Sequence, residues 1–196
     1  MKYNITVIGV GALGSHVIQL LRNVDDGNGT SLVAVDFDRV EQKNTMSQFH
    51  PKGTVGRHKT VALQQTMNFL WGRSIDAKSA KVTADNVKEI LQGANLVIDC
   101  LDNGASRRVI QAHVREKAYP CLHGALAANG SFGRVIWDED FVIDDETGQG
   151  GGTCEDGAHL PFIALVSSYI AWAAQEFHLH GKKMGFSVSM AGAIRI

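Results

Sequence analysis

The sequence predicts an α/β fold in which helices cover both faces of a mostly parallel sheet. Short apolar runs rich in valine and isoleucine alternate with longer segments of helical periodicity through the first two thirds of the chain. The runs are apolar along their length, as expected for strands that are buried on both faces. The last third departs from this alternation, so we expect the sheet to become mixed towards the C-terminus.

The N-terminal part begins with a strand and a helix. Residues 3–10 (YNITVIGV) form an apolar run that reaches a glycine, and they predict a buried strand followed by a helix over residues 11–24. Residues 25–30 contain two glycines and predict a turn, after which residues 31–36 (SLVAVD) predict a second buried strand. Residues 37–57 are polar and contain proline and glycine, which favours a long loop.

The middle of the chain repeats the alternation. Helices are predicted over residues 58–71, 86–93 and 105–118, and strands over residues 75–82 and 94–100. The second of these helices ends in glycine, which commonly closes a helix, and the second strand is the continuous apolar run ANLVIDC. Each strand is thus separated from the next by a helix, which is the pattern of parallel crossovers.

Beyond residue 119 the pattern changes. A strand is predicted to begin at Pro120, since proline suits the first position of a strand, and residues 131–137 (SFGRVIW) predict another strand shortly after it. We expect the acidic, glycine-rich residues 138–157 to form a flexible crossover loop. A buried helix is predicted over residues 158–180, and residues 185–196 predict a short β end.

Composition predicts one globular domain over residues 1–196. The apolar share is 44% and the charged share 20%, which allows a sizeable core. We expect no signal peptide, because the N-terminus runs directly into a strand. We expect no membrane span either, because the apolar run 160–174 is shorter than the ~20 residues that a bilayer requires. Three cysteines do not suggest a disulfide framework, so a cytoplasmic location is expected.

Negative charge is concentrated in the predicted crossover loop. The loop holds eight acidic residues and no lysine or arginine: Asp138, Glu139, Asp140, Asp144, Asp145, Glu146, Glu155 and Asp156. Without them the formal charge of the chain would change from −1 to +7. A mildly basic body suits a phosphate-bearing ligand, whereas the acidic loop argues against a nucleic-acid surface and suits a basic partner. The simpler alternative is a solvated loop.

A glycine motif indicates a nucleotide site. Gly9, Gly11 and Gly14 have GxGxxG spacing, follow a predicted strand and open a predicted helix. This is the context of a Rossmann-like site, where the backbone approaches phosphate and the helix N-terminus supplies N–H groups. Asp36 ends the next strand, where a carboxylate accepts hydrogen bonds from ribose hydroxyls. The ligand could be a nicotinamide or an adenine nucleotide, and the alternative is that the glycines serve only strand–helix packing.

Four further segments occur in a specific order along the chain: VDFDRVEQKN (35–44), VGRHK (55–59), VIDCLDN (97–103) and TCEDGAHLPFIALVSSYIAWAAQE (153–176). Their order and spacing resemble the ubiquitin-activating-enzyme-like adenylyltransferases, the ThiF/MoeB/HesA family. The resemblance extends from Tyr3 to about Met190. It implies ATP-dependent adenylation of a carboxylate, usually the C-terminal glycine of a small ubiquitin-like or sulfur-carrier protein.

The resemblance also implies residue roles in an ATP site. The glycine motif would lie under the phosphates, Asp36 would bind the ribose, and Asp38 would lie close by. Asn44 and Lys59 would contact the phosphates, with Lys59 also stabilising the transition state. Asp102 would hold a catalytic Mg²⁺. The alternatives are that Asp99 and Asp102 only cap the following helix and that Lys59 is a solvated lysine in the first turn of a helix.

The position of Cys154 before the long apolar helix matches that of a thiol in some members of the family. There the thiol takes the acyl group from the adenylate or forms a sulfur link to the carrier. The helix dipole would lower the pKa of this thiol, while Glu155 and Asp156 would raise it. The alternative is an exposed but inert thiol. We expect Cys100 and Cys121 to be small buried residues within strands.

The sequence departs from the family pattern at three points. The family's N-x-x-R-Q arginine position is Ser47, and the arginine that relatives supply from an N-terminal extension has no counterpart before the first strand. Arg57, His58, Lys43 or Lys52 could replace the lost phosphate contacts. The paired CxxC motifs of many relatives are absent, so no zinc is expected. Relatives usually form homodimers, and the same is expected here.

Three other functions stay open. Loss of the arginine at position 47 would suit a non-catalytic module that keeps the fold and binds a partner. The GxGxxG motif and Asp36 alone would suit an NAD-dependent oxidoreductase. A dehydratase acting on a modified tRNA carboxylate is a further alternative, which the acidic loop makes less attractive.

Overall fold

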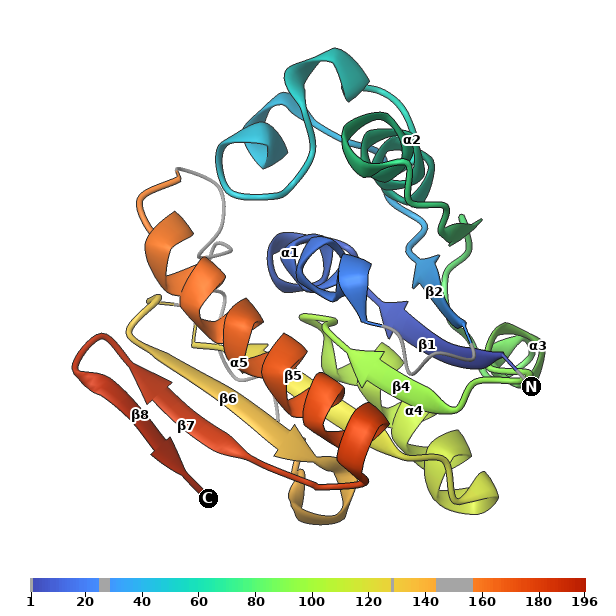
Figure 1. The fold of residues 1–196 in the computed structure, drawn as a ribbon, viewed down its shortest axis with the longest axis vertical. Coiled ribbons are helices and arrows are strands. Elements are labelled where there is room, and N and C mark those ends of the chain that lie inside the picture. Colours follow the sequence, from blue (N-terminus) through green and yellow to red (C-terminus); the bar gives the residue numbers. More distant parts are fainter. Residues whose placement is uncertain (1, 25–28, 128, 144–156) are drawn as a thin grey trace.

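The computed structural model describes residues 2–24, 29–127, 129–143 and 157–196. In these residues, eight strands form one sheet in the order β3-β2-β1-β4-β5-β6-β7-β8 (Figure 1). The strands are β1 (Tyr3–Ile8), β2 (Thr30–Val35), β3 (Asp76–Lys78), β4 (Leu96–Asp99), β5 (Cys121–Leu126), β6 (Phe132–Trp137), β7 (Phe186–Ser189) and β8 (Gly192–Arg195). The α-helices are α1 (Ala12–Leu20), α2 (Lys59–Trp71), α3 (Val87–Ile90), α4 (Gly104–Lys117) and α5 (Leu160–His180).

The sheet is parallel in its first half and antiparallel in its second. Strands β3, β2, β1, β4 and β5 pair in parallel, and β5 through β8 pair antiparallel. Each parallel strand is reached by a crossover, whereas the short connection from β5 to β6 permits only an antiparallel return. The prediction of an α/β fold with a sheet that becomes mixed towards the C-terminus is confirmed.

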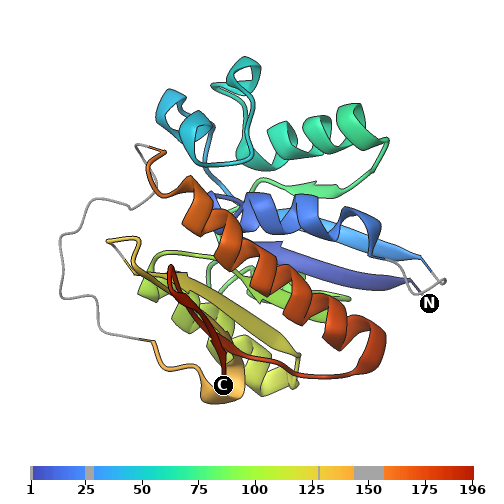
Figure 2. The same cartoon turned by 60° about the vertical axis from the view of Figure 1, so that its left-hand side comes forward.

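Helices cover both faces of the sheet. The larger buried cluster joins α1, α2 and α5 to one face, and a smaller cluster joins α3 and α4 to the other. The strands alternate between the clusters: Leu32 and Ala34 of β2 face the first, and Val33 and Val35 face the second. Figures 1 and 2 show α5 crossing one face of the sheet beside α1, with α4 on the opposite face.

Several predicted elements differ in extent. The helix predicted over residues 11–24 is α-helical to Leu20 and continues as a 3₁₀ turn, η1 (Leu21–Asn23). The loop predicted over residues 37–57 contains two 3₁₀ turns, η2 (Gln42–Met46) and η3 (Lys52–Thr54). The strand predicted over residues 75–82 is only the short edge strand β3, because β2 alone pairs with it. Most of the acidic segment 138–157 lies outside the described residues, although it begins with the 3₁₀ turn η4 (Asp138–Asp140).

The topology places a crevice at the carboxyl ends of β1, β2 and β4. The chain leaves β1 towards β2 on one side and reaches β4 on the other, so β1 is the point where the strand order reverses. Loops after adjacent strands diverge at such a switch point and leave room for a ligand. Along the part of the chain that the structure describes, no helix combines the length and hydropathy that crossing a membrane requires.

Candidate functional site

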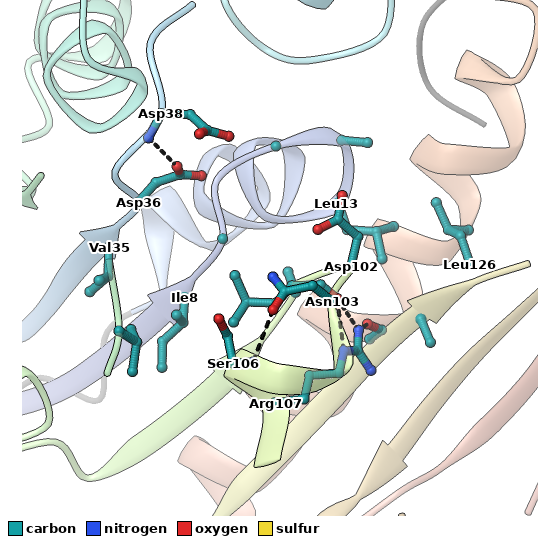
Figure 3. A pocket seen from close by; sticks show the side chains of 18 of the residues that line it. Ile8, Leu13, Val35, Asp36, Asp38, Asp102, Asn103, Ser106, Arg107 and Leu126 are labelled. Carbon is teal, nitrogen blue, oxygen red and sulfur yellow. Dashed lines mark hydrogen bonds between the residues drawn. The ribbon is translucent and has the colours of Figure 1, made fainter. Parts of the chain in front are cut away.

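A cavity of about 680 Å³ opens at this switch point. Its walls come from the loops after β1, β2 and β4, the N-termini of α1 and α4, and parts of β5 and β6. In Figure 3, Asp36 and Asp38 lie on the β2 side of the cavity, while Asp102 and Asn103 lie beside the N-terminus of α4. The carboxylates predicted from separate motifs therefore line one cavity.

The three glycines of the motif are required for different structural reasons. Gly9 has a φ of +82°, and a Cβ there would lie 3.0 Å from the backbone of Cys100. A Cβ on Gly14 would lie 1.9 Å from the carbonyl oxygen of Gly9, so Gly14 permits the close packing of α1 on β1. At Gly11 the nearest atom to an added Cβ is a side-chain nitrogen 3.9 Å away. Packing alone therefore accounts for Gly9 and Gly14 but does not account for Gly11, which faces the cavity.

The N-terminus of α1 is aimed into the cavity. Gly11 is the N-cap residue without a side chain to satisfy the first amides, and Gly11, Ala12 and Leu13 line the cavity. The first amides of a helix lack partners within the helix and carry the positive end of its dipole. The preceding residue, Val10, is held on both sides: its N–H donates to Asp36 Oδ2 at 2.9 Å, and its carbonyl accepts from His50 Nε2 at 2.8 Å. The loop is thus fixed around an anion-binding position.

Asp36 is buried at the end of β2 and orders the loops around it. Its Oδ2 accepts from Val10 N, and its Oδ1 accepts from Asp38 N at 2.8 Å. Burial raises the pKa of this carboxyl, and the charge of Lys59 together with the two backbone N–H donors partly offsets that effect. The carboxylate keeps further lone pairs for hydroxyl donors, as its predicted contact with a ribose requires.

Lys59 is buried although it is the first residue of α2. Its side chain is 9% exposed, and its Nζ lies 2.9 Å from Asp38 Oδ2. A cation in the first turn of a helix opposes the helix dipole, so this position is unfavourable without a compensating anion. Asp38 supplies that anion, and both residues line the cavity. The interpretation of Lys59 as a solvated surface lysine is therefore wrong.

Asn44 and Ser47 belong to the turn η2. Asn44 is buried, lines the cavity and accepts from Glu41 N at 2.8 Å through Oδ1, within a reciprocal cap with the Glu41 side chain. Ser47, at the family's arginine position, is 1% exposed and is absent from the residues that line the cavity. Its carbonyl accepts from His16 Nε2 at 3.0 Å. Of the four suggested replacements, Lys43 lines the cavity, and Arg57, His58 and Lys52 do not.

Asp102 presents an exposed carboxylate to the cavity. The N-cap of α4 is Asn103, whose Oδ1 accepts from Ser106 N at 2.9 Å. Asp102 is therefore not the residue that caps this helix. Within the described ranges, the Asp102 carboxylate has no hydrogen bond or ion pair with another residue. Asp99, the last residue of β4, points away from this rim and contacts His123.

Basic and aromatic residues that the sequence did not indicate also line the cavity: Phe37, Lys81, Arg107, Arg134 and Phe141. Lys81 Nζ lies 5.5 Å from the Phe37 ring, beside Asp36. Arg107 is buried and donates from Nε to Leu101 O at 2.8 Å and from Nη2 to Gly124 O at 2.7 Å, so it braces the loop that carries Asp102. The sequence held one signal for Arg107: it is a basic residue near the start of a predicted helix, where the helix dipole favours acidic residues.

Of the two cysteines predicted to be buried within strands, the structure places only Cys121 there. Cys121 begins β5 and is buried, as predicted, and burial raises the pKa of its thiol. Cys100 lies just beyond β4, is partly exposed and lines the cavity, so its placement within a strand was wrong. The exposed part of Cys100 does not include its thiol group, which is buried; this burial and the nearby Asp99 raise the pKa of the thiol and disfavour a thiolate at neutral pH. Cys154 lies outside the described residues.

Mg²⁺ fits the acidic rim of the cavity. Proteins commonly hold this ion through one or two carboxylates, with waters and substrate phosphates completing its shell. Asp102 offers one carboxylate without a protein partner in the described ranges, close to a helix N-terminus that suits phosphate. No group of three or more His, Cys, Asp or Glu residues suited to a metal ion occurs in the part of the chain that is described.

The sequence matches the ThiF family over residues 1–180. The SAMP-activating enzyme E1 of Haloferax volcanii is 33% identical over 131 residues, which cover 64% of this chain and 46% of that protein. The molybdopterin-synthase adenylyltransferase of Salmonella typhimurium is 26% identical over 184 residues, which cover 90% of this chain and 73% of that protein. The chain thus spans about half the length of the first relative and about three quarters of the second.

Solved structures share the fold. The tRNA N6-threonylcarbamoyladenosine dehydratase TcdA of E. coli, crystallised in complex with AMP, superposes with a TM-score of 0.66 over 92% of this chain and 88% of that chain. The two sequences are 18% identical, so this likeness is evidence for the fold alone.

Proposed function

The chain belongs to the ThiF family, and we propose that it binds ATP and adenylates the C-terminal carboxylate of a small ubiquitin-like or sulfur-carrier protein. The observation that carries this proposal is the convergence on one cavity of an open helix N-terminus, the Lys59–Asp38 pair and the Asp102 carboxylate, which has no partner among the described residues. The names of the two relatives, a SAMP-activating enzyme and a molybdopterin-synthase adenylyltransferase, support the same activity. TcdA, crystallised in complex with AMP, is an example of this fold with an adenine nucleotide bound.

The nucleotide would be held by groups from both sides of β1. Its phosphates would lie over Gly11 and the first amides of α1, where a side chain at position 11 would stand in the way. The ribose would donate to the Asp36 carboxylate. Phe37 and Lys81 line the adjoining wall and would contact the base.

The reaction would be an in-line displacement at the α-phosphorus of ATP. A carboxylate oxygen of the carrier C-terminus would form a bond to that phosphorus as the bond to the bridging oxygen breaks, which gives an acyl-adenylate and pyrophosphate. Lys59 would leave Asp38 for the phosphates and stabilise the charge that builds up on them. Asp102 would hold the Mg²⁺ ion, which when bound neutralises phosphate charge.

Other basic residues would make the phosphate contacts of the family's arginine, whose position Ser47 occupies in this chain. Ser47 is buried away from the cavity, whereas Lys43, Lys81 and Arg134 line it. Arg134 projects from β6, and its guanidinium lies 5.8 Å from the Phe132 ring. We assign these side chains to the polyphosphate or to the carboxylate of the incoming chain.

Cys154 would act after adenylation. Its thiolate would attack the acyl carbonyl and release AMP, which leaves a thioester. Alternatively it would attack the outer sulfur of a protein persulfide, which transfers that sulfur to Cys154 and releases the donor cysteine as a thiolate. The resemblance of the segment from Thr153 to Glu176 to the family supports this assignment. We further propose that residues 1–196 act as one nucleotide-binding domain in a cytoplasmic homodimer.

Calorimetry with the whole chain tests the proposal. We expect Mg-ATP to bind and NAD to fail to bind, and the Asp102→Asn variant to bind Mg-ATP more weakly. Asp85→Asn is the matched control, because Asp85 is an exposed aspartate away from the cavity. Weaker binding in both variants would argue against a specific role of Asp102. Binding of NAD alone would overturn the adenylation proposal in favour of an oxidoreductase.

Exchange of labelled pyrophosphate into ATP then identifies the acceptor. Exchange that depends on a carrier with a free C-terminal glycine would support the proposal. Carrier binding without exchange would favour the non-catalytic module that Ser47 suggests. Exchange that depends instead on a carboxylate-bearing tRNA would favour a dehydratase of the kind that TcdA is named for.

A further inference from the structure

A buried histidine lies between two carboxylates behind the cavity. His123, on β5, has a fully buried side chain. Its Nδ1 lies 2.8 Å from Asp99 Oδ2, and its Nε2 lies 3.0 Å from Asp138 Oδ1. Both ring nitrogens therefore have an acceptor oxygen within hydrogen-bond distance.

This geometry selects the protonated ring. A neutral imidazole has one N–H, so it would direct a lone pair at one of the two carboxylates. An imidazolium donates to both. Burial on its own lowers the pKa of His123, but the hydrogen bonds to Asp138 and Asp99 outweigh it, so the pKa is raised. Burial on its own raises the pKa of the Asp138 carboxyl. Its hydrogen bonds with His123, Arg115 and Gln111 outweigh burial and lower this pKa to about 2.

The other ionisable groups around the ring come from two elements, β5 and α4. On β5, Cys121 Sγ lies 3.5 Å from His123 Nε2. On α4, Arg107 Nε lies 3.7 Å from Asp99 Oδ2, and Arg115 Nε lies 2.7 Å from Asp138 Oδ2. Each buried carboxylate thus has an arginine on one side and the ring on the other.

One carboxylate belongs to the loop that carries Asp102. Asp99 is the last residue of β4, and its Oδ1 accepts from Leu101 N at 3.0 Å. Leu101 and Asp102 both line the cavity. The orientation of Asp99 therefore sets the start of the loop that presents Asp102.

The other carboxylate belongs to the opposite wall. Asp138 begins η4, and the Phe141 ring stacks on the His123 ring with a centroid distance of 4.1 Å and an interplanar angle of 10°. The Phe141 carbonyl accepts from Gln111 Nε2 at 3.0 Å. Residues 141–143 line the cavity, so this turn shapes its wall.

We propose that His123, as a buried imidazolium, is a positioning residue that holds the Asp102 loop and the wall at residues 141–143 in a fixed relation. The ring touches neither the cavity nor any position proposed for the nucleotide, so it acts through Asp99 and Asp138. Its expected effect on nucleotide binding rests on the proposed function, but its charge and its two contacts do not.

The protonation state is tested by ¹⁵N NMR of the histidine ring nitrogens between pH 5.5 and 9. We expect one ring, identified by its loss in His123→Gln, to keep both nitrogens protonated at pH 7.5. In Asp138→Asn this ring should lose a proton at lower pH than in the wild type, while the amide oxygen can still accept from Nε2. A wild-type His123 with a single N–H at pH 7 would overturn the proposal.

Hydrogen exchange measured by mass spectrometry tests the positioning itself. In His123→Gln and Asp138→Asn we expect at least a fivefold faster exchange in peptides that cover residues 99–103 and 138–143, with exchange in β1 unchanged. Asp140→Asn, an exposed aspartate in the same turn, is the matched control and should exchange as the wild type does. If both variants fold and exchange at the wild-type rate in these peptides, the proposal is wrong.

Mg-ATP affinity of the same variants separates this inference from the proposed function. If the wild type binds no ATP, while the variants still alter ring protonation and hydrogen exchange, the proposed function is wrong and the positioning role of His123 is supported. If the wild type binds ATP and neither variant changes exchange or affinity, the function stands and the positioning fails.

Discussion

Lys59 Nζ lies 2.9 Å from Asp38 Oδ2, so the first residue of α2 is paired with the loop that follows β2. The two residues are 21 positions apart in the chain. The helix dipole opposes a cation at this buried position, and the Asp38 carboxylate compensates for it. A perturbed charge pair that lines a cavity is typical of a functional site.

Replacement of Lys59 should weaken nucleotide binding. A charge-assisted hydrogen bond contributes about 1.5–3 kcal/mol, so we expect Lys59→Ala to lower Mg-ATP affinity by about 10- to 100-fold. Lys52→Ala, an exposed lysine outside the cavity, is the control and should bind normally. Calorimetry makes the comparison. Equal affinity for Lys59→Ala and the wild type would exclude a phosphate contact from Lys59.

Two glycine substitutions should separate packing from ligand binding. In Gly14→Ala the new Cβ would lie 1.9 Å from the Gly9 carbonyl oxygen, so we expect a loss of at least about 2 kcal/mol in the free energy of unfolding. In Gly11→Ala the nearest atom is 3.9 Å away, so the loss of stability should be smaller while Mg-ATP affinity falls. Urea denaturation and calorimetry measure the two effects. A Gly11→Ala protein that binds ATP normally would place the phosphates elsewhere.

The raised pKa of His123 predicts a pH-dependent stability. The folded protein holds this proton more tightly than the unfolded chain, whose histidine pKa is about 6.5. The stabilisation is therefore fully present below pH 6.5 and is lost as the pH rises through the folded value. His123→Gln should be about 3–5 kcal/mol less stable than the wild type at pH 6, because it leaves two buried carboxylates without their cation.

Thermal unfolding of both proteins from pH 5.5 to 9 checks this dependence. The difference between wild type and His123→Gln should shrink at the alkaline end. Subtracting the two curves removes the contribution of His50, whose burial lowers its pKa to about 4 and which is present in both proteins. A difference that grows with pH would mean that His123 is neutral in the folded state.

Cys154 can be tested independently of adenylation. We expect Cys154→Ala to keep pyrophosphate exchange, because the thiol would act after the adenylate forms, and to lose any thiol-linked carrier product. Cys100→Ala is the control, since the raised pKa of Cys100 disfavours its thiolate. Non-reducing gels with mass spectrometry detect the product. A covalent adduct that survives in Cys154→Ala would rule out this residue.

The order of the elements was predictable because each one is stabilised by a local pattern. Apolar runs such as residues 94–100 and the periodic segment 105–118 became β4 and α4 with shifts of one or two residues at most ends. The length of an element was less predictable where contacts with neighbouring elements determine it. The strand predicted over residues 75–82 is reduced to the edge strand β3, which among the described strands pairs with β2 alone. The helix predicted over residues 86–93 is reduced to Val87–Ile90.

The sequence by itself determined the glycine motif and the carboxylate after β2, because these lie next to strand ends whose position periodicity reveals. Lys59 and Asp102, which also line the cavity, were indicated by the resemblance to the family. The sequence also determined that Ser47 stands where the family has arginine. Only the tertiary structure decided that Lys59 is buried against Asp38, that Arg107 braces the Asp102 loop, and that His123 bridges Asp99 and Asp138. Those contacts join residues 6 to 24 positions apart, and only the pairing of the strands and the packing of the helices bring their side chains within hydrogen-bond distance.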